Sequence, residues 1–399
     1  MKTEHSTTTN SSMAETETLV SSPPIQSPQP AIPSDSLPQL ISRLEEDLIF
    51  LQILPSLPPK TLIRFQLVSK KWKTLISSTQ FVKWTLNCTN TNPFASLRYC
   101  FFVKSPHSLK LLDCDRYDDV GVNVDDSDVD GLIDLDDLGT ENGYKFVRLI
   151  GSCNGLLCVS MYRAGGTYSG KRSRLYVYNP ITRLHFVVSN PVKSITACGF
   201  GYLESSNDYV IVLVSEGKGL FCMFSLNSSE WRDLKCRCRG LSGGGAFVNE
   251  KLHWLVDRGE GTGTREKCVL VVDLGDESCE ELMLIPKLNE NSRLCVMGSR
   301  LCIWTADFVS GEMWMLRKYG EWGTWTKLLS LDMVAGFESP CLNCFGITES
   351  RKALVQCGDR LVLVDPHQKP SRHVSLVKGV VDDSAVIFVE SLVSPFPAT

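Results

Sequence analysis

A unit of 45 to 48 residues recurs through the last two thirds of this 399-residue chain. Each copy has an apolar strand, a turn with Asn, Asp or Gly, and a second strand that is apolar or carries tryptophan. Equivalent points in five copies are spaced by 45, 48, 45 and 48 residues, at Tyr176, Phe221, Val269, Trp314 and Val362. A repeat of this length in a chain of short β-branched and aromatic runs predicts a β-propeller with one four-stranded sheet per blade.

A sixth copy, Leu109–Asp113, lies further upstream because an acidic insertion separates it from the others. Counting it, the sequence predicts about six or seven blades between residues 98 and 393. Asn154-Gly155 and Asn249-Glu250 are hairpin signals. Three tryptophans are expected in the core between blades: Trp231, Trp254 and Trp314. Propellers bind ligands with the loops at the ends of the central channel. In this sequence these loops vary too much for a substrate-binding residue to be predicted.

Short amphipathic helices are expected between residues 43 and 87. Pro59 can begin a helix because the first turn needs no amide donor, and Ser69 can cap the next one. The apolar positions are Leu48, Ile49, Leu51, Ile53 and Leu54 in a first segment, Leu62 and Phe65 in a second, and Trp72, Leu75 and Ile76 in a third. Three helices in about 40 residues cannot bury this surface alone. They need another protein as partner, or they cap the chain's own second domain.

This helical stretch resembles the F-box, the module by which substrate receptors of Skp-cullin-F-box (SCF) ubiquitin ligases attach to the Skp-type adaptor. The matching residues are Leu57-Pro58, Lys60, Leu62, Arg64-Phe65, Val68-Ser69-Lys70, Trp72, Leu75-Ile76 and Phe81. The start departs from the family pattern, because Glu45 stands where the family has proline and one extra residue precedes Ile53-Leu54. Pro55 also replaces a small polar residue. A shifted or shortened first helix is therefore expected.

The β-rich part resembles the F-box-associated domain of plant F-box proteins, which is related to kelch-type propellers. Four segments carry this resemblance in order: Gly151–Cys158, Val177–Thr182, Cys198–Gly201 and Phe247–Leu255. The resemblance implies an α+β multidomain chain, with a small three-helix F-box (43–87) followed by an all-β, kelch-like propeller (98–393).

The same resemblance implies a non-catalytic substrate-recognition subunit of an SCF-type E3 ubiquitin ligase. Such a subunit docks on the Skp-family adaptor and, through it, on cullin, and its propeller binds a target protein for ubiquitination and proteasomal degradation. The residues expected to carry docking are Leu48, Ile53, Leu54, Leu57, Pro58, Leu62, Phe65, Val68 and Trp72. Two alternatives stay open: a propeller scaffold that binds proteins without a ligase, and a propeller enzyme of hydrolase or oxidase type.

Composition narrows the classes of partner. The net charge of −4 by itself indicates neither a nucleic acid nor a membrane, and no run reaches the roughly 18 apolar residues of a membrane span. Residues 1–42 are rich in Ser, Thr and Pro, without the apolar core of a signal peptide, and are expected to be a disordered tail. We therefore expect a cytoplasmic and/or nuclear protein, and we interpret its sixteen cysteines as free thiols. Lys235, Arg237 and Arg239 alternate as on a solvated edge strand.

The acidic insertion, residues 113–141, holds twelve carboxylates and one arginine, so the rest of the chain carries a net charge of +7. Residues 126–137 have the ligand spacing of an EF-hand calcium loop. Because their flanks are poor helix formers, a mobile acidic loop is favoured, with a weak calcium site as the alternative. Cys341 and Cys344 have the near spacing of a zinc knuckle without a second pair. The six histidines form no visible triad, and neither a metal nor a cofactor is expected.

Overall fold

The computed structural model describes residues 48–90, 98–104, 108–117, 144–163, 173–192, 194–215, 219–258, 266–283, 288–307, 309–332, 341–367 and 373–397. The tail 1–42, the calcium-loop spacing at 126–137 and most of the acidic insertion lie outside the described residues. The chain divides into two compact units, Met1–Ile49 and Phe50–Thr399. Nearly all of the described structure belongs to the second unit.

Five helical segments precede the strands in the described part of the chain. They are a π-helical turn η1 (Ile49–Ile53), a 3-10 turn η2 (Leu54–Ser56), and the helices α2 (Pro59–Phe65), α3 (Lys70–Ile76) and α4 (Thr79–Asn90). Pro59 occupies the first turn of α2, and the Ser69 hydroxyl accepts a hydrogen bond from the Trp72 amide at 3.2 Å. Both predicted helix starts are therefore confirmed. In the described residues the first segment is the irregular pair η1 and η2, with Pro55 at the start of η2.

Helix α4 is the third α-helix of the described module, and it follows α3, whereas the sequence predicts the third helix upstream of Pro58. The stretch between Leu57 and Leu86 is predicted as two helices, yet a further one begins after Ser78. The Ser78 hydroxyl and carbonyl accept hydrogen bonds from the amides of Phe81 at 3.3 Å and Val82 at 3.0 Å. Phe81 and Leu86 are buried, and Leu86 belongs to the same buried cluster as strands of the propeller.

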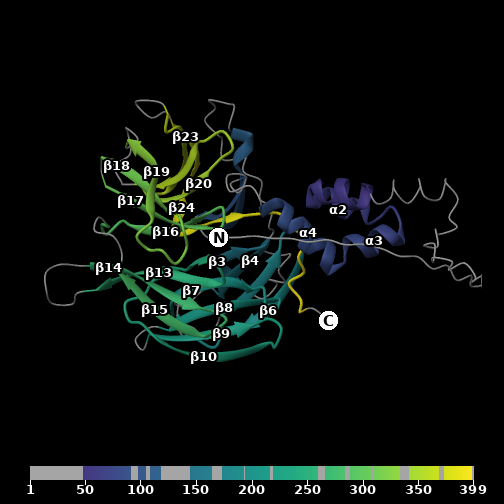
Figure 1. The fold of residues 1–399 in the computed structure, drawn as a ribbon, viewed down its shortest axis with the longest axis horizontal. Coiled ribbons are helices and arrows are strands. Elements are labelled where there is room, and N and C mark those ends of the chain that lie inside the picture. The colour runs from purple at the N-terminus through teal and green to yellow at the C-terminus, as the bar shows by residue number, and fades with distance from the viewer. Residues whose placement is uncertain are drawn as a thin grey trace, which may run out of the picture. The chain divides into compact units, whose positions relative to one another are not determined.

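Five blades are four-stranded antiparallel sheets whose strands follow one another in sequence (Figure 1). The first of these blades consists of β3 (Tyr144–Cys153), β4 (Leu156–Arg163), β5 (Ser173–Asn179) and β6 (Leu184–Ser189), and the second of β7 (Ile195–Leu203), β8 (Asp208–Ser215), β9 (Leu220–Ser225) and β10 (Glu230–Arg237). The third consists of β12 (Ala246–Val248), β13 (Lys251–Arg258), β14 (Glu266–Asp273) and β15 (Ser278–Met283), and the fourth of β16 (Arg293–Met297), β17 (Arg300–Ala306), β18 (Ser310–Leu316) and β19 (Trp325–Asp332). The fifth consists of β20 (Cys341–Ile347), β21 (Ala353–Cys357), β22 (Arg360–Val364) and β23 (His373–Lys378). A short strand, β11 (Gly243–Gly244), pairs in parallel with β7.

The sixth blade closes the ring with strands from both ends of the domain. It consists of β24 (Val380–Phe388), β1 (Tyr99–Lys104) and β2 (Ser108–Asp113) among the described residues. The first strands of adjacent blades contact one another around the ring, including the contacts of β24 with β3 and with β20. The propeller therefore has six blades, and the option of a seventh is wrong.

Local turn chemistry explains the repeat in the sequence. The five equivalent points all fall on the third strand of their blades, and the sixth copy is β2, the third strand of the closing blade. After β5 and β14, the turn carries an Asn or Asp whose side-chain oxygen accepts backbone amides. Asn179 accepts from Ile181 at 2.8 Å, and Asp273 accepts from Gly275 at 3.0 Å. These side chains stabilise the reversal between the third and fourth strands.

Both predicted hairpins are present. Asn154 and Gly155 join β3 to β4 with φ of 51° and 77°, and Asn249 and Glu250 join β12 to β13 with φ of 51° and 59°. Positive φ at both central residues is the hairpin geometry that matches the twist of the strands.

The tryptophan prediction is only partly correct. Trp254 is buried, whereas Trp231 and Trp314 are half-buried. Trp231 still connects two blades, because its indole N–H donates to the Ser189 carbonyl at 3.0 Å. The fully buried Trp304 was not among the predicted core tryptophans.

The described cysteines are mostly buried free thiols, as expected, including Cys158, Cys198, Cys222, Cys268 and Cys302, while Cys295 is half-buried. Cys357 is the exception, because it is disulfide-bonded. In the part of the chain that the structure describes, no helix is both long and apolar enough to cross a membrane.

Candidate functional site

The nine residues predicted to carry docking differ in how accessible they are. The exposed ones are Leu48, Ile53, Pro58 and Val68, the half-buried ones are Leu57, Phe65 and Trp72, and the buried ones are Leu54 and Leu62. Because Leu54 and Leu62 are buried, a partner can reach only the other seven without unfolding the module. Their part in docking stays a prediction.

Trp72 holds the helical module together. Its ring meets Phe65 of α2 edge-to-face at 5.5 Å between centroids, and meets Phe50 of η1 in the same way at 5.8 Å. The Lys71 ammonium lies 5.3 Å from the centroid of Phe50. Edge-to-face aromatic pairs add about 0.5–1.5 kcal/mol each beyond the area they bury. Trp72 therefore fixes the positions of η1, α2 and α3 relative to one another.

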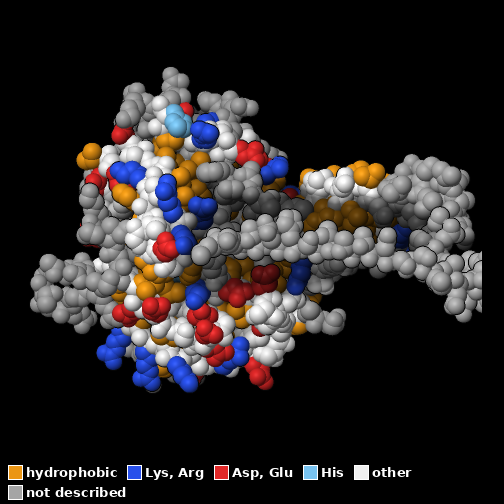
Figure 2. All heavy atoms as spheres, viewed as in Figure 1, with side chains coloured by type: hydrophobic (Ala, Val, Ile, Leu, Met, Phe, Trp, Pro, Cys, Tyr) orange, Lys and Arg blue, Asp and Glu red, His pale blue; other side chains and the backbone are white. Residues whose placement is uncertain are grey.

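Large apolar side chains are exposed on this module. Leu67 and Val68 are 87% and 62% exposed in the turn between α2 and α3, while their amides donate to the carbonyls of Arg64 and Phe65. Leu51 and Ile53 of η1 are each more than half exposed. Figure 2 shows hydrophobic side chains gathered over the helical part of the molecule. We call Leu51, Ile53, Leu67 and Val68 the apolar surface.

Sequence reasoning left Leu51 and Leu67 out of the predicted docking set. Leu67 has a usable signal, since it precedes Val68 directly before the Ser69 cap, where the helical periodicity of α2 has already ended. Two large apolar side chains in a turn between helices do not lie on a core-facing side of either helix. Such a pair indicates a surface for another protein.

Comparison with known proteins agrees with this geometry. A family model described as the F-box domain matches residues 32–84. The chain carries an F-box domain.

Two relatives that match most of the chain are named as F-box proteins, one of them with kelch repeats. F-box/kelch-repeat protein At3g23880 of Arabidopsis thaliana is 24% identical, over 86% of this chain and 94% of its own length. F-box protein At4g22390 of Arabidopsis thaliana is 23% identical, over 70% of this chain and 72% of its own length. Among solved structures, TolB from Acinetobacter baumannii is similar with a TM-score of 0.45 and 10% identity, over 80% of this chain and 72% of TolB.

Charged groups surround the F-box helices. Lys60 of α2 pairs with Glu390 at 3.0 Å, and its ammonium lies 5.7 Å from the centroid of the Tyr99 ring. Burial, and then the charge of Glu390, raise the pKa of Tyr99 to about 12. Lys70 and Lys73 of α3 are exposed. Lys70 follows Val68 by two residues, so one exposed positive charge lies beside this part of the apolar surface.

Other candidate sites have structural explanations. His253 is buried, with Nδ1 3.0 Å from the Ala246 carbonyl and Nε2 2.8 Å from the Tyr319 hydroxyl. Burial lowers the pKa of His253 to about 4, so the ring is neutral at pH 7. Because a carbonyl only accepts, Nδ1 carries the proton and Nε2 accepts from Tyr319. This histidine fixes Tyr319 in place.

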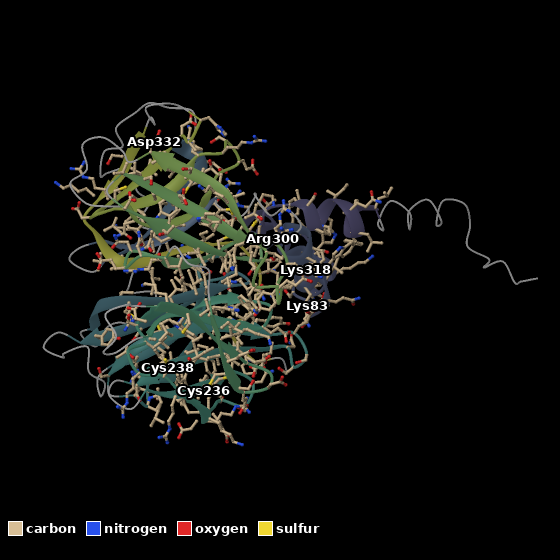
Figure 3. All side chains as sticks on the ribbon, turned by 60° about the vertical axis from the view of Figure 1, so that its left-hand side comes forward. Lys83, Cys236, Cys238, Arg300, Lys318 and Asp332 are labelled. Carbon is tan, nitrogen blue, oxygen red and sulfur yellow. The ribbon has the colours of Figure 1, made fainter. Side chains whose placement is uncertain are left out.

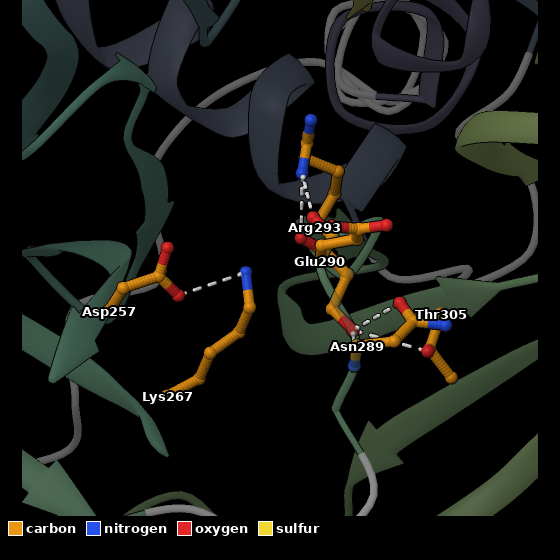
Figure 4. Close-up of polar contacts among 7 residues, drawn as sticks. Asp257, Lys267, Asn289, Glu290, Arg293 and Thr305 are labelled. Carbon is orange, nitrogen blue, oxygen red and sulfur yellow. Dashed lines mark hydrogen bonds and ion pairs between the residues drawn. The ribbon is translucent and has the colours of Figure 1, made fainter. Parts of the chain in front are cut away.

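Further polar clusters in the propeller have mutually satisfied partners (Figure 4). The Asp257 carboxylate pairs with Lys267 at 3.3 Å across β13 and β14. Before β16, the Ser292 hydroxyl donates to Thr305 at 3.1 Å, and the Arg293 guanidinium donates to the Glu290 carbonyl at 3.1 Å. These contacts stabilise strand pairs and connections.

The cysteine pair near residue 344 and the basic residues 235–237 also have structural explanations. Cys344 is buried, and burial raises its pKa to about 12. Within the described ranges, no group of three or more His, Cys, Asp or Glu side chains is placed to hold a metal ion. Lys235 and Arg237 are exposed on the edge strand β10, where the intervening Cys236 is buried (Figure 3). The prediction of a solvated edge is confirmed there.

Proposed function

We propose that this protein is the substrate-recognition subunit of an SCF-type E3 ubiquitin ligase. It docks through the F-box domain on a Skp-family adaptor and, through that, on cullin, and it binds a target protein through the propeller. The chain itself performs no chemistry in this proposal. It holds target lysines near the conjugating enzyme and raises their effective concentration. A cytoplasmic and/or nuclear location remains part of the same prediction.

The observation that carries the proposal is the apolar surface within a matched F-box domain. Leu67 and Val68 lie in water while the neighbouring Leu54 and Leu62 are buried. An apolar residue exposed at such a junction gains about 1.5–3 kcal/mol when another protein covers it. Several of them together are enough to support a specific interface.

Co-purification of the full-length chain with a Skp-type adaptor and cullin tests the proposal. The variant replaces Leu57 and Pro58 by alanine. Both side chains are accessible, and α2 begins from the Pro58 carbonyl, which accepts from Thr61 at 2.8 Å and remains in alanine. We expect the adaptor to be lost from the variant, while its thermal unfolding stays close to that of the original chain.

Two outcomes would contradict the proposal. Retention of the adaptor by the variant would mean that these side chains do not carry docking. Failure of the original chain to bind any Skp-type adaptor would favour the scaffold alternative, in which the propeller binds proteins without a ligase. The irregular first segment, η1 and η2, is the observation that favours this alternative.

A further inference from the structure

A small hollow lies between two blades of the propeller. It measures about 190 Å³ and is lined by Val248, Ser299, Arg300, Leu301, Leu316, Arg317 and Tyr319. Pockets for drug-sized ligands span about 300–1,000 Å³, so this one fits a small group. Its apolar lining comes from the strands β12, β17 and β18, and its polar lining from the turns that follow or precede them.

Backbone geometry presents the two arginines of the hollow. Gly298 and Ser299 form the tight turn between β16 and β17, with φ of 50° and 60°, and Arg300 begins β17 directly after it. Arg317 follows the end of β18, where its amide donates to the Thr324 carbonyl at 3.2 Å. Arg300 is labelled in Figure 3, as is Lys318, which follows Arg317 in the chain. Turns at the ends of two adjacent strand pairs thus bring both arginines to one hollow.

Two neighbouring acids, Glu321 and Asp273, are already engaged, and Glu280 is a third whose charge acts on Tyr319. Lys318, next in the chain to Arg317, pairs with Glu321, and Asp273 pairs with Lys251 at 2.5 Å. In the described part of the chain, the ion pairs found do not include Arg300 or Arg317. Arg300 and Arg317 therefore line the hollow without an ion pair among the described residues. Arginine forks match carboxylate and phosphate groups.

Tyr319 limits what the ligand can be. Its hydroxyl proton is donated to Nε2 of His253, so its oxygen is left as an acceptor at the rim. Burial, and then the charges of Asp273 and Glu280, raise the pKa of Tyr319 to about 12, which keeps it protonated at pH 7. The charge of an anionic ligand must then be met by the arginines.

We propose that this hollow binds a small organic anion, a carboxylate or phosphate group carried on a short apolar body. The arginines bind the charged group, and Val248, Leu301 and Leu316 contact the apolar part. The same chemistry could come from a free small molecule or from an acidic side chain of a bound peptide. This inference does not rest on adaptor docking.

Ligand-observed NMR titration of the full-length protein tests the inference. The probes are benzoate and phenyl phosphate, with benzamide as the neutral match. We expect both anions to bind at least tenfold more tightly than benzamide. Arg300→Gln and Arg317→Gln should each weaken anion binding about tenfold, because each removes one charge-assisted contact. Arg237→Gln, on the exposed face of β10, is the matched control and should leave it unchanged.

A second pair of probes separates the two sources of the anion. These are the capped tripeptides acetyl-Leu-Glu-Leu-amide and acetyl-Leu-Gln-Leu-amide. Tighter binding of the Glu peptide than of benzoate would assign the hollow to an acidic peptide, and binding of benzoate alone would assign it to a free small anion. Equal binding of benzoate and benzamide, or equal anion affinity in the Arg300, Arg317 and Arg237 variants, would overturn the proposal. So would the failure of all these probes to bind.

Discussion

Asn179 ties the C-terminal segment to the first complete blade, and its replacement by alanine should destabilise the propeller. The side chain is fully buried. Its amide nitrogen donates to the carbonyls of Ser391 at 3.0 Å and Val393 at 2.7 Å. Its oxygen accepts from the amides of Ile181 at 2.8 Å and Thr182 at 3.2 Å. Alanine removes all four bonds at once.

The size of the effect follows from burial. A hydrogen bond contributes about 1 kcal/mol net, and a buried group left without a partner costs about 1–3 kcal/mol. Ser391 and Val393 are themselves buried, so water does not readily replace the lost donor. We expect Asn179→Ala to lower the free energy of unfolding by about 3–4 kcal/mol. At about 2 °C for each kcal/mol in a domain of this size, the melting temperature falls by roughly 6 °C or more.

Asn227→Ala is the matched control, since this amide also donates to two backbone carbonyls, of Ser206 at 3.1 Å and Asn207 at 3.3 Å. Asn227 is exposed, so water replaces its bonds and the expected change is within about 0.5 kcal/mol. Urea and thermal unfolding of both variants measure the difference. Loss of stability in Asn179→Ala within 1 kcal/mol of that in Asn227→Ala would refute the argument that the buried bonds hold the C-terminal segment.

Three further predictions concern single residues. Gly155→Ala should lower the free energy of unfolding in urea by more than about 2 kcal/mol, because φ is +77° there and an added Cβ would lie 2.1 Å from Ser391 Oγ. The control Gly240→Ala, at φ +74° with nothing within 4 Å of the added Cβ, should cost only the backbone strain of about 1 kcal/mol. Equal losses in the two variants would refute the steric argument. The pKa of His253 is about 4 in the folded protein and ordinarily 6.5, so its contribution to the free energy of unfolding is complete above pH 6.5. As the pH falls towards 4, up to about 3 kcal/mol of that contribution is lost. The free energy of unfolding should therefore depend less steeply on pH in His253→Gln, and an unchanged slope would contradict this. Cys279, the exposed free thiol among the described cysteines, should react with iodoacetamide in the folded protein well before the buried thiols do. Peptide mapping measures this, and equally fast reaction of a buried thiol such as Cys100 would contradict the difference in exposure.

The repeat in the sequence was sufficient to predict the propeller. In the five complete blades strand three pairs on both sides, and it is mostly apolar in β9 and β14, so it stands out from its surroundings. The number of blades was less certain, because closure depends on β24 pairing with β1 across almost the whole domain. No local pattern in Val380–Phe388 specifies that partner.

In the helical module, the starts of α2 and α3 were predictable from the sequence, whereas the separate helix α4 was not. Ser69 and Pro59 signal helix starts through local chemistry that a sequence displays directly. Helix α4 was missed because Ser78 lies only two residues beyond the end of α3, and its apolar residues read as a continuation. The hollow at Arg300 and Arg317 was not predictable, since it forms where turns of different strand pairs meet.

The central claim is that the apolar surface of the F-box domain binds a Skp-type adaptor, and calorimetric titration of the purified full-length chain with the purified adaptor tests it most directly. The decisive pair of double variants is Leu67→Glu with Val68→Glu, and Leu184→Glu with Val187→Glu on the edge strand β6, where the leucine and valine are likewise exposed. We expect one-to-one binding by the original chain and by the β6 variant, with a loss of at least a hundredfold in affinity for the Leu67/Val68 variant. Equal affinity of the two variants, or no binding by the original chain, would contradict it.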